Sequence, residues 1–219
     1  MLYGVIFDMD GVLIDSFEPH KRSWQQMARE RGVKMTDEQF AATFGRTSRD
    51  IIRRLWDEGV SDEQIRRMDD RKEALFRDLL REHLPAMPGA LELIDDLAAH
   101  GFKLGVGSSG PPENVNLVVD SLGLKDRLTG IVTGMDVTRG KPDPQVFLLA
   151  AERMKIDPAR CAVVEDAVHG ITAARRAGMT AVALTGTAPR AAFAQADLVV
   201  DSLTELGAAR LARLIDGSD

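Results

Sequence analysis

The sequence lacks the features of a disulfide-bonded, zinc-binding or membrane-spanning protein. Its 219 residues include one cysteine, Cys161, so no disulfide can form within the chain. Cys161 begins the apolar run CAVV and is predicted to be buried and unreactive. The four histidines are scattered without the spacing of a zinc site. No apolar stretch reaches the roughly 18 residues of a membrane-spanning helix, and no basic leader is recognisable, which predicts a cytoplasmic protein.

Aromatic residues are scarce, at 5%, and the 28 lysines and arginines are outnumbered by 34 aspartates and glutamates. Hydrophobic residues make up 44% and charged residues 28%, which is ordinary for a soluble globular protein. The net charge of -6 argues against nucleic acid or an anionic membrane as a partner. It does not exclude a small anionic ligand, because a local cluster of donors can bind one. We expect a monomer that acts on a small molecule.

Short apolar runs rich in β-branched residues recur along the chain and have the length of buried strands. Segments with helical periodicity separate them. This alternation predicts an α/β fold with a doubly wound, mostly parallel sheet covered by helices on both faces. The expected strands are Tyr3 to Phe7, Lys103 to Gly107, Gly130 to Thr133, Cys161 to Val164, Thr180 to Leu184 and Leu198 to Val200.

One interval, from about Phe17 to His83, has no strand pattern and is dense in charged, helix-forming residues. Thr36 and Ser61 each precede a glutamine at the third following position, which is the signature of a helix N-terminus. The interval is therefore predicted to be an inserted α-helical domain. The expected domains are residues 1–15 with 87–219 for the α/β core, and residues 16–86 for the insertion.

The first strand ends in two carboxylates, Asp8 and Asp10, followed by Gly11. Ligands of an open parallel sheet bind beyond the carboxyl ends of its strands. Residues two apart in a strand share a face, so both carboxylates can enter one pocket. The pattern alone fits an ordinary acidic turn equally well.

Three later loops carry further candidates. Gly107–Gly110, followed by Pro111 at a helix start, offers a hydroxyl and backbone N–H groups that suit a phosphate. Lys141 stands in a proline-rich turn that could aim it inward. Glu165 and Asp166 end a buried strand, where carboxylates are costly unless a cation such as magnesium neutralises them. Each loop alone could be unremarkable, but their shared position at strand ends indicates one composite site.

Together these motifs resemble the haloacid dehalogenase-like hydrolase superfamily over nearly the whole chain. The helical insertion after the first motif is similar to the small α-helical cap of β-phosphoglucomutase-like and phosphoglycolate phosphatase-like members. The matching segments are FDMDGVLIDS at 7–16, GSSG at 107–110, GKPDP at 140–144 and VVEDAVHGITAARRAGM at 163–179.

The resemblance implies a role for each matching residue. Asp8 would be the nucleophile that becomes an aspartyl-phosphate, and Asp10 the general acid and base. Ser108 would hydrogen-bond the transferred phosphoryl group, and Lys141 would neutralise charge between nucleophile and phosphate. The implied magnesium ligands are Asp8, Asp10 through its backbone carbonyl, Asp166, and Glu165 directly or through water.

The chemistry agrees with these roles. A carboxylate that attacks a phosphate ester is repelled unless cations lie between the two anions. Asp10 can be protonated to assist a leaving alcohol and then deprotonated to activate water. The dehalogenases of the superfamily lack an acid at this place, so Asp10 favours a phosphatase or a phosphomutase.

Substrate choice is expected to come from the cap. His20 and Lys72 lean towards a mutase, whereas Arg46 and Arg49 straddle the position where mutases of this type have an arginine. We therefore predict a magnesium-dependent phosphatase of a small metabolite such as a sugar phosphate. A β-phosphoglucomutase-like mutase is the alternative, and an inactive binding protein a third. The expected substrate-binding residues are Ser109, Gly110, His20, Gly45, Arg46, Arg49 and Lys72.

The substitution Asp8→Asn should abolish turnover and leave the fold intact, because the amide is nearly isosteric with the carboxylate but is a poor nucleophile. Phosphate release and thermal unfolding, measured on the same preparation, would check both statements. Turnover comparable to that of the wild type would contradict the role of Asp8.

Overall fold

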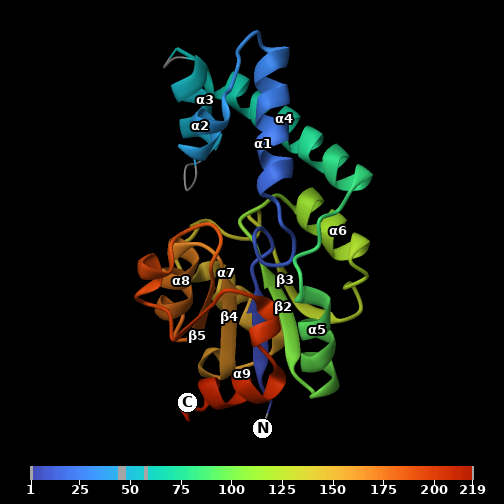
Figure 1. The fold of residues 1–219 in the computed structure, drawn as a ribbon, viewed down its shortest axis with the longest axis vertical. Coiled ribbons are helices and arrows are strands. Elements are labelled where there is room, and N and C mark those ends of the chain that lie inside the picture. The colour runs from blue at the N-terminus through green and yellow to red at the C-terminus, as the bar shows by residue number, and fades with distance from the viewer. Residues whose placement is uncertain (1, 44–47, 57–58, 219) are drawn as a thin grey trace. The chain divides into compact units, whose positions relative to one another are not determined.

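The computed structural model describes residues 2–43, 48–56 and 59–218 (Figure 1). The chain forms two compact units. We call Met1–Asp15 with Ala86–Asp219 the core unit and Ser16–Pro85 the helical unit. Among the described residues, no helix is both long enough and apolar enough to cross a bilayer.

The core unit is built on a six-stranded sheet in the order β3-β2-β1-β4-β5-β6. All its strand pairs are parallel, which confirms the predicted doubly wound sheet. The first strand of the sequence lies in the middle, because the chain winds outward from it in both directions. The strands are β1 Gly4–Phe7, β2 Lys103–Gly107, β3 Leu128–Val132, β4 Cys161–Glu165, β5 Thr180–Leu184 and β6 Leu198–Val200.

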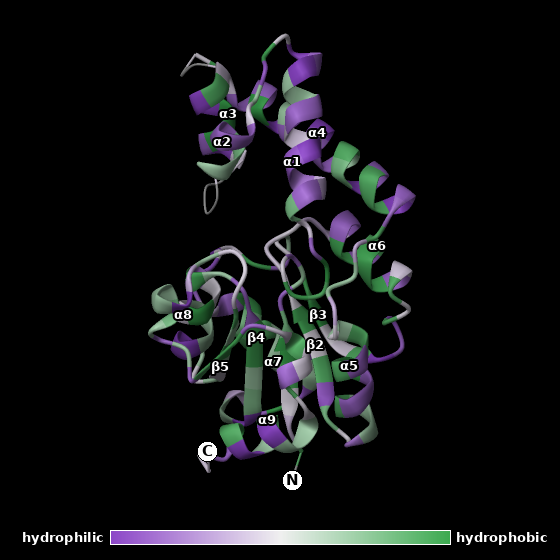
Figure 2. Cartoon of the chain, viewed as in Figure 1, coloured by the Kyte–Doolittle hydropathy of each residue, from purple (hydrophilic) through white to green (hydrophobic). Residues whose placement is uncertain are grey.

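Helices cover the sheet and exclude water from its strands. On one face, Ile6 and Val163 pack with α7 and α8 in a single apolar cluster. Cys161 belongs to this cluster, is fully buried as predicted, and burial raises the pKa of its thiol to about 12. Figure 2 shows the strands in hydrophobic colours and the helices with mixed faces. The helices are α5 Ala90–Ala99, α6 Pro112–Ser121, α7 Gln145–Met154, α8 Val168–Arg176 and α9 Ala208–Ile215.

Glycines allow α7 to lie close to the sheet. A Cβ on Gly130 in β3 would come 2.6 Å from the carbonyl oxygen of Ala150 in α7. A Cβ on Gly105 in β2 would come 2.6 Å from the sulfur of Met154 and 2.7 Å from the carbonyl oxygen of Gly130. Only glycine fits at these positions without displacing the helix.

The helical unit contains α1 Phe17–Glu30, α2 Asp37–Ala41, α3 Ser48–Trp56 and α4 Asp62–Glu82. The part of it that the structure describes has no strand. Both predicted capping boxes are present, with Thr36 accepting from Gln39 and Ser61 from Gln64. The unit has an apolar core of its own that includes Trp24, Met27, Phe40, Ile52, Met68 and Leu75.

The substitution Gly130→Ala should lower the free energy of unfolding by about 1–3 kcal/mol, because the methyl group would overlap a backbone oxygen of α7. Chemical denaturation would measure the change. Gly140→Ala is the matched control, since no atom lies within 4 Å of its added Cβ. Equal stability of the two variants would contradict this account of the packing.

Candidate active site

The predicted site residues of the core unit lie around the carboxyl-terminal edge of the sheet. Asp8 directly follows β1, and its amide donates to the carbonyl of Val164 in β4 at 2.9 Å. Ser108 follows β2, and its amide donates to the carbonyl of Val132 in β3 at 3.0 Å. Glu165 is the last residue of β4. The parallel register therefore brings residues from distant parts of the sequence to one edge.

Lys141 occupies the centre of the site. Its Nζ donates to Asp8 Oδ1 at 2.7 Å and to Glu165 Oε1 at 2.6 Å. The ammonium group also lies 4.9 Å from the ring centroid of Phe147. Burial opposes its charge, but the carboxylates of Asp8 and Glu165 outweigh burial and hold the pKa of Lys141 above its ordinary value. Lys141 is thus a fixed cation rather than a solvated loop residue.

Asp8, Glu165 and Asp166 form a compact acidic cluster. One oxygen from each of them lies within 4.8 Å of the others, and all three residues are buried. Burial and the charge of the neighbouring carboxylates, partly opposed by Lys141, raise the pKa of Asp8 to about 7 and that of Asp166 to about 8. A single lysine does not balance three carboxylates, so the cluster carries excess negative charge when all of them are ionised.

The donor set fits a small divalent cation. All three candidate ligands are carboxylate oxygens, which Mg²⁺ prefers. Gly11, with φ of 75°, also leaves room for Asp166, because a Cβ there would overlap its carboxylate. Thr187, which the sequence motifs do not include, donates its hydroxyl to the carbonyl of Asp166. Its position in the loop after β5, at the same edge of the sheet as the other site residues, is the feature of the sequence that could have indicated it.

Glu165 is engaged at both oxygens. Oε1 accepts from Lys141, and Oε2 accepts from the amide of Ala167 at 2.6 Å. Gly170 in α8 permits this arrangement, since a Cβ there would overlap the Glu165 carboxylate. Of the two adjacent carboxylates, Asp166 is therefore better suited to bind a cation directly, and Glu165 to support the site from behind.

The loop after β2 is internally braced. Ser108 is 1% exposed, and its Oγ accepts the amide of Gly110 at 3.0 Å. That bond leaves the hydroxyl hydrogen of Ser108 to donate elsewhere. Ser109, the next residue, is exposed. The roles of Ser109 and Gly110 in substrate binding stay predictions.

Asp10 lies in the tight turn that follows Asp8. The amide of Gly11 donates to the carbonyl of Ile14 at 2.8 Å, and Leu13 donates to Met9 at 2.9 Å, which closes the turn. The charge of Asp10 contributes to the raised pKa of Asp8, so the two carboxyl groups interact. Two interacting carboxyl groups in different surroundings can divide nucleophilic and acid–base roles.

Two predicted substrate-binding residues meet within the helical unit. Lys72 is 3% exposed, and its Nζ lies 2.9 Å from His20 Nδ1 and donates to Glu73 at 2.8 Å. The His20 ring stacks on Phe76 at a centroid distance of 4.0 Å. Arg49 instead forms an ion pair with Asp62 on the surface of the unit. Gly45 and Arg46 lie outside the described residues.

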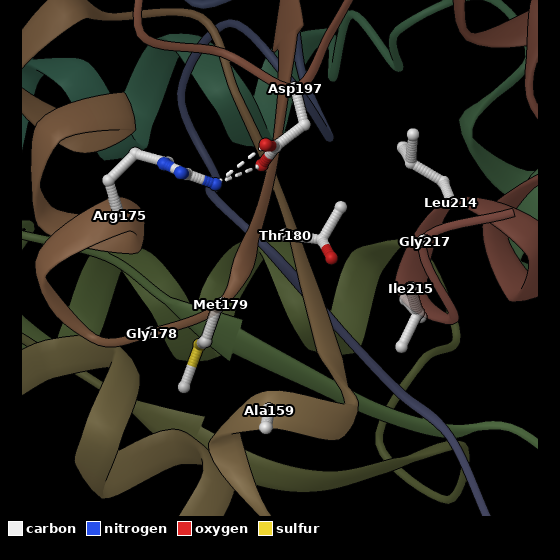
Figure 3. A pocket seen from close by; sticks show the side chains of 9 residues that line it. All are labelled: Ala159, Arg175, Gly178, Met179, Thr180, Asp197, Leu214, Ile215 and Gly217. Atoms are coloured by element: carbon white, nitrogen blue, oxygen red, sulfur yellow. Dashed lines mark hydrogen bonds and ion pairs between the residues drawn. The ribbon is translucent and has the colours of Figure 1, made fainter. Parts of the chain in front are cut away.

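A pocket of about 480 Å³ lies elsewhere in the core unit (Figure 3). It adjoins Thr180, the first residue of β5, and the end of α9, so it is at the amino-terminal edge of the sheet. Arg175 and Asp197 face each other across its wall in a two-bond ion pair. None of the predicted site residues lines it.

Fold and site together define an α/β protein with a buried lysine–carboxylate centre at the carboxyl edge of a parallel sheet. Comparison with known proteins agrees. The haloacid dehalogenase-like hydrolase profile matches residues 4–178. Validoxylamine A 7'-phosphate phosphatase from Streptomyces hygroscopicus subsp. limoneus is 33% identical, with 92% of this chain and 94% of the relative covered. The Bacillus subtilis beta-phosphoglucomutase is 30% identical, with 92% and 90% covered.

Solved structures give the same result. The beta-phosphoglucomutase from Clostridium difficile superposes with a TM-score of 0.85 and 26% identity, covering 99% of this chain and 98% of that one. The chain belongs to the haloacid dehalogenase-like hydrolase family. The family predicted from the four motifs is thereby confirmed.

Without a divalent cation, the stability of the protein should fall as pH rises from about 4 towards 8. Asp8 and Asp166 have raised pKa values in the folded state, so the folded protein holds protons that the unfolded chain has already lost. Mg²⁺ should therefore stabilise the protein more at pH 8.5 than at pH 5.5. At pH 8.5, Mg²⁺ at 100 times its Kd should add about 2.7 kcal/mol to the free energy of unfolding. Thermal unfolding with and without Mg²⁺ at both pH values would measure this.

Asp166→Asn should remove most of the Mg²⁺ effect at pH 8.5. Asp197→Asn, whose carboxylate lies at the other edge of the sheet, is the control and should keep it. An equal Mg²⁺ shift at the two pH values would contradict the assignment.

Proposed function

We propose that this enzyme is a magnesium-dependent phosphatase that hydrolyses a small sugar or polyol phosphate through an aspartyl-phosphate on Asp8. The main support is the buried Asp8 carboxylate, which accepts a hydrogen bond from Lys141 and lies beside the carboxylates of Glu165 and Asp166. Such a site can stabilise the negative charge of a phosphoryl transition state when cations offset the charge of the carboxylates. Its relatives include a fructose-1-phosphate phosphatase, a hexitol phosphatase and a beta-phosphoglucomutase, which supports the substrate class.

In the first step, an ionised Asp8 oxygen attacks phosphorus and the bond from phosphorus to the leaving oxygen breaks. Asp10 donates its proton to that oxygen, so the alcohol leaves neutral. Ser108 donates its hydroxyl to a phosphoryl oxygen, and Lys141 offsets the charge that gathers between Asp8 and the phosphoryl group. Mg²⁺, held by Asp8, Asp166 and the main chain of Asp10, would supply the remaining positive charge.

In the second step, Asp10 accepts a proton from water as the water oxygen attacks phosphorus. The bond between phosphorus and Asp8 breaks, which releases inorganic phosphate and restores both carboxyl groups. The raised pKa of Asp8 means that a cation is needed to keep it ionised near neutral pH. Cation binding and nucleophile activation are thus coupled in this proposal.

A sugar phosphomutase is the second candidate. It is favoured by the His20–Lys72 pair in the helical unit and by the name of the Bacillus subtilis relative. Against it, Arg49 is bound to Asp62 on the surface of its unit, so it is not held ready for a second phosphate. Ser109, Gly110, Gly45, Arg46, Arg49, His20 and Lys72 stay proposals as substrate-binding residues.

We further propose that the enzyme works as a cytoplasmic monomer without nucleic acid or membrane partners. The single cysteine and the net charge of -6 support this setting.

A panel of sugar and polyol phosphates, assayed with Mg²⁺ for free phosphate, tests the proposal. The phosphatase should release phosphate from at least one ester, lose activity in EDTA and regain it with Mg²⁺. With β-glucose 1-phosphate, glucose 6-phosphate formation without net phosphate release would instead identify a mutase. Rapid-quench trapping should find phosphate on Asp8, with Asp8→Asn as the control, and its absence with a true substrate would overturn the mechanism.

A further inference from the structure

The turn that follows β3, residues Thr133–Asp136, lies directly against the loop that carries Ser108. The amide of Gly134 donates to the carbonyl of Gly110 at 2.8 Å. A Cβ on Gly134 would overlap the carbonyl oxygen of Ser109, so the two backbones are in close contact. The turn therefore sets the position of the Ser109–Gly110 backbone from behind.

The turn is itself fixed by one carboxylate. Oδ2 of Asp136 accepts the amide of Thr133 at 2.8 Å and its hydroxyl at 2.7 Å. Oδ1 accepts from Arg153 of α7 at 2.6 Å, and Arg153 also donates to the carbonyl of Ile131 in β3. Arg153 and Thr133 hold the pKa of Asp136 down at about 2, so the carboxylate stays charged throughout the working pH range.

These contacts form a continuous path to the Ser108 hydroxyl. Asp136 fixes the turn, the turn holds the Gly110 carbonyl, and the Gly110 amide donates to Ser108 Oγ. The last bond orients the hydroxyl of Ser108, whose hydrogen is left to donate. The side chain of Met135 takes no part in the path, because it is 80% exposed.

We propose that Asp136 and Arg153 are positioning residues that hold the Thr133–Asp136 turn against the Ser108 loop and so set its affinity for a phosphoryl group. The proposal rests on the proposed function, because it takes Ser108 to bind phosphate. Neither residue touches the substrate. Asp136 and Arg153 would act on the phosphate site indirectly, through the hydrogen bond between the backbones of Gly134 and Gly110.

The chain contains a matched control for this arrangement. Asp197 accepts Arg175 at 2.6 and 2.7 Å and the amide of Ala181 at 2.8 Å, so it also joins an arginine to a backbone amide. It does so at the amino-terminal edge of the sheet, in the wall of the pocket in Figure 3. Asp197→Asn should therefore cost stability without affecting a phosphate site at the opposite edge.

The experiment measures the affinity of the Mg²⁺-loaded enzyme for inorganic phosphate as a competitive inhibitor, together with kcat, KM and the Mg²⁺ affinity. Asp136→Asn and Arg153→Lys should weaken phosphate binding by about tenfold or more, since a displacement of about 1 Å in a catalytic site can cost a hundredfold. Their Mg²⁺ affinity should stay at the wild-type value. Asp197→Asn and Met135→Ala should keep the wild-type phosphate affinity.

Gly134→Ala tests the same path without changing the Asp136–Arg153 ion pair, because it pushes on the Ser109 carbonyl directly. It should also weaken phosphate binding while sparing Mg²⁺ affinity. Wild-type phosphate affinity in both Asp136→Asn and Gly134→Ala would overturn the inference, as would an equal loss in Asp197→Asn. If the wild type neither binds phosphate nor hydrolyses any ester, the proposed function fails instead.

Discussion

The ion pairs of Lys141 are the interaction on which the rest of the site depends. A buried ammonium group between Asp8 and Glu165 is stable only because both carboxylates accept its hydrogen bonds, and the carboxylates tolerate burial only because it is there. Removing one partner would leave an uncompensated buried charge. The arrangement therefore ties the loop before α7 to the ends of β1 and β4.

The charge balance of the centre explains its chemistry. Lys141 offsets part of the negative charge, while burial and the remaining carboxylate charge raise the pKa values of Asp8 and Asp166. A centre with this imbalance is well prepared for a divalent cation and, with the cation, for a phosphate ester. Glu165 accepts hydrogen bonds from Lys141 and from the Ala167 amide, and so keeps the lysine in place. Burying this carboxylate costs free energy of folding, which is typical of a functional site.

Close backbone contact is the second constraint. Gly105 and Gly130 let α7 approach the sheet, and α7 in turn supplies Phe147 beneath Lys141 and Arg153 at the turn after β3. Gly11 and Gly134 allow equally close contact at the site itself. The same absence of side chains therefore brings both the scaffold and the candidate phosphate loop into position.

Much of this could be predicted from the sequence. The apolar runs and the helical periods between them predicted the parallel sheet, because buried strands and amphipathic helices have distinct patterns. The capping boxes at Thr36 and Ser61 were predicted for a similar reason, since a cap depends on residues only three apart. The family followed from four motifs in order, and the profile match confirmed it.

The sequence by itself determined which residue types stand at the strand ends, and hence that carboxylates, a hydroxyl and a lysine would meet at one edge. Only the tertiary structure decided which side chains pair with one another: Lys141 joins Asp8 to Glu165, and Arg49 pairs with Asp62. Local patterns specify strands, helices and caps because those depend on near neighbours in the chain. Lys141 lies 133 positions from Asp8 and 24 from Glu165 in the sequence, so these contacts depend on the register of the sheet and on the packing of α7, which no local pattern contains.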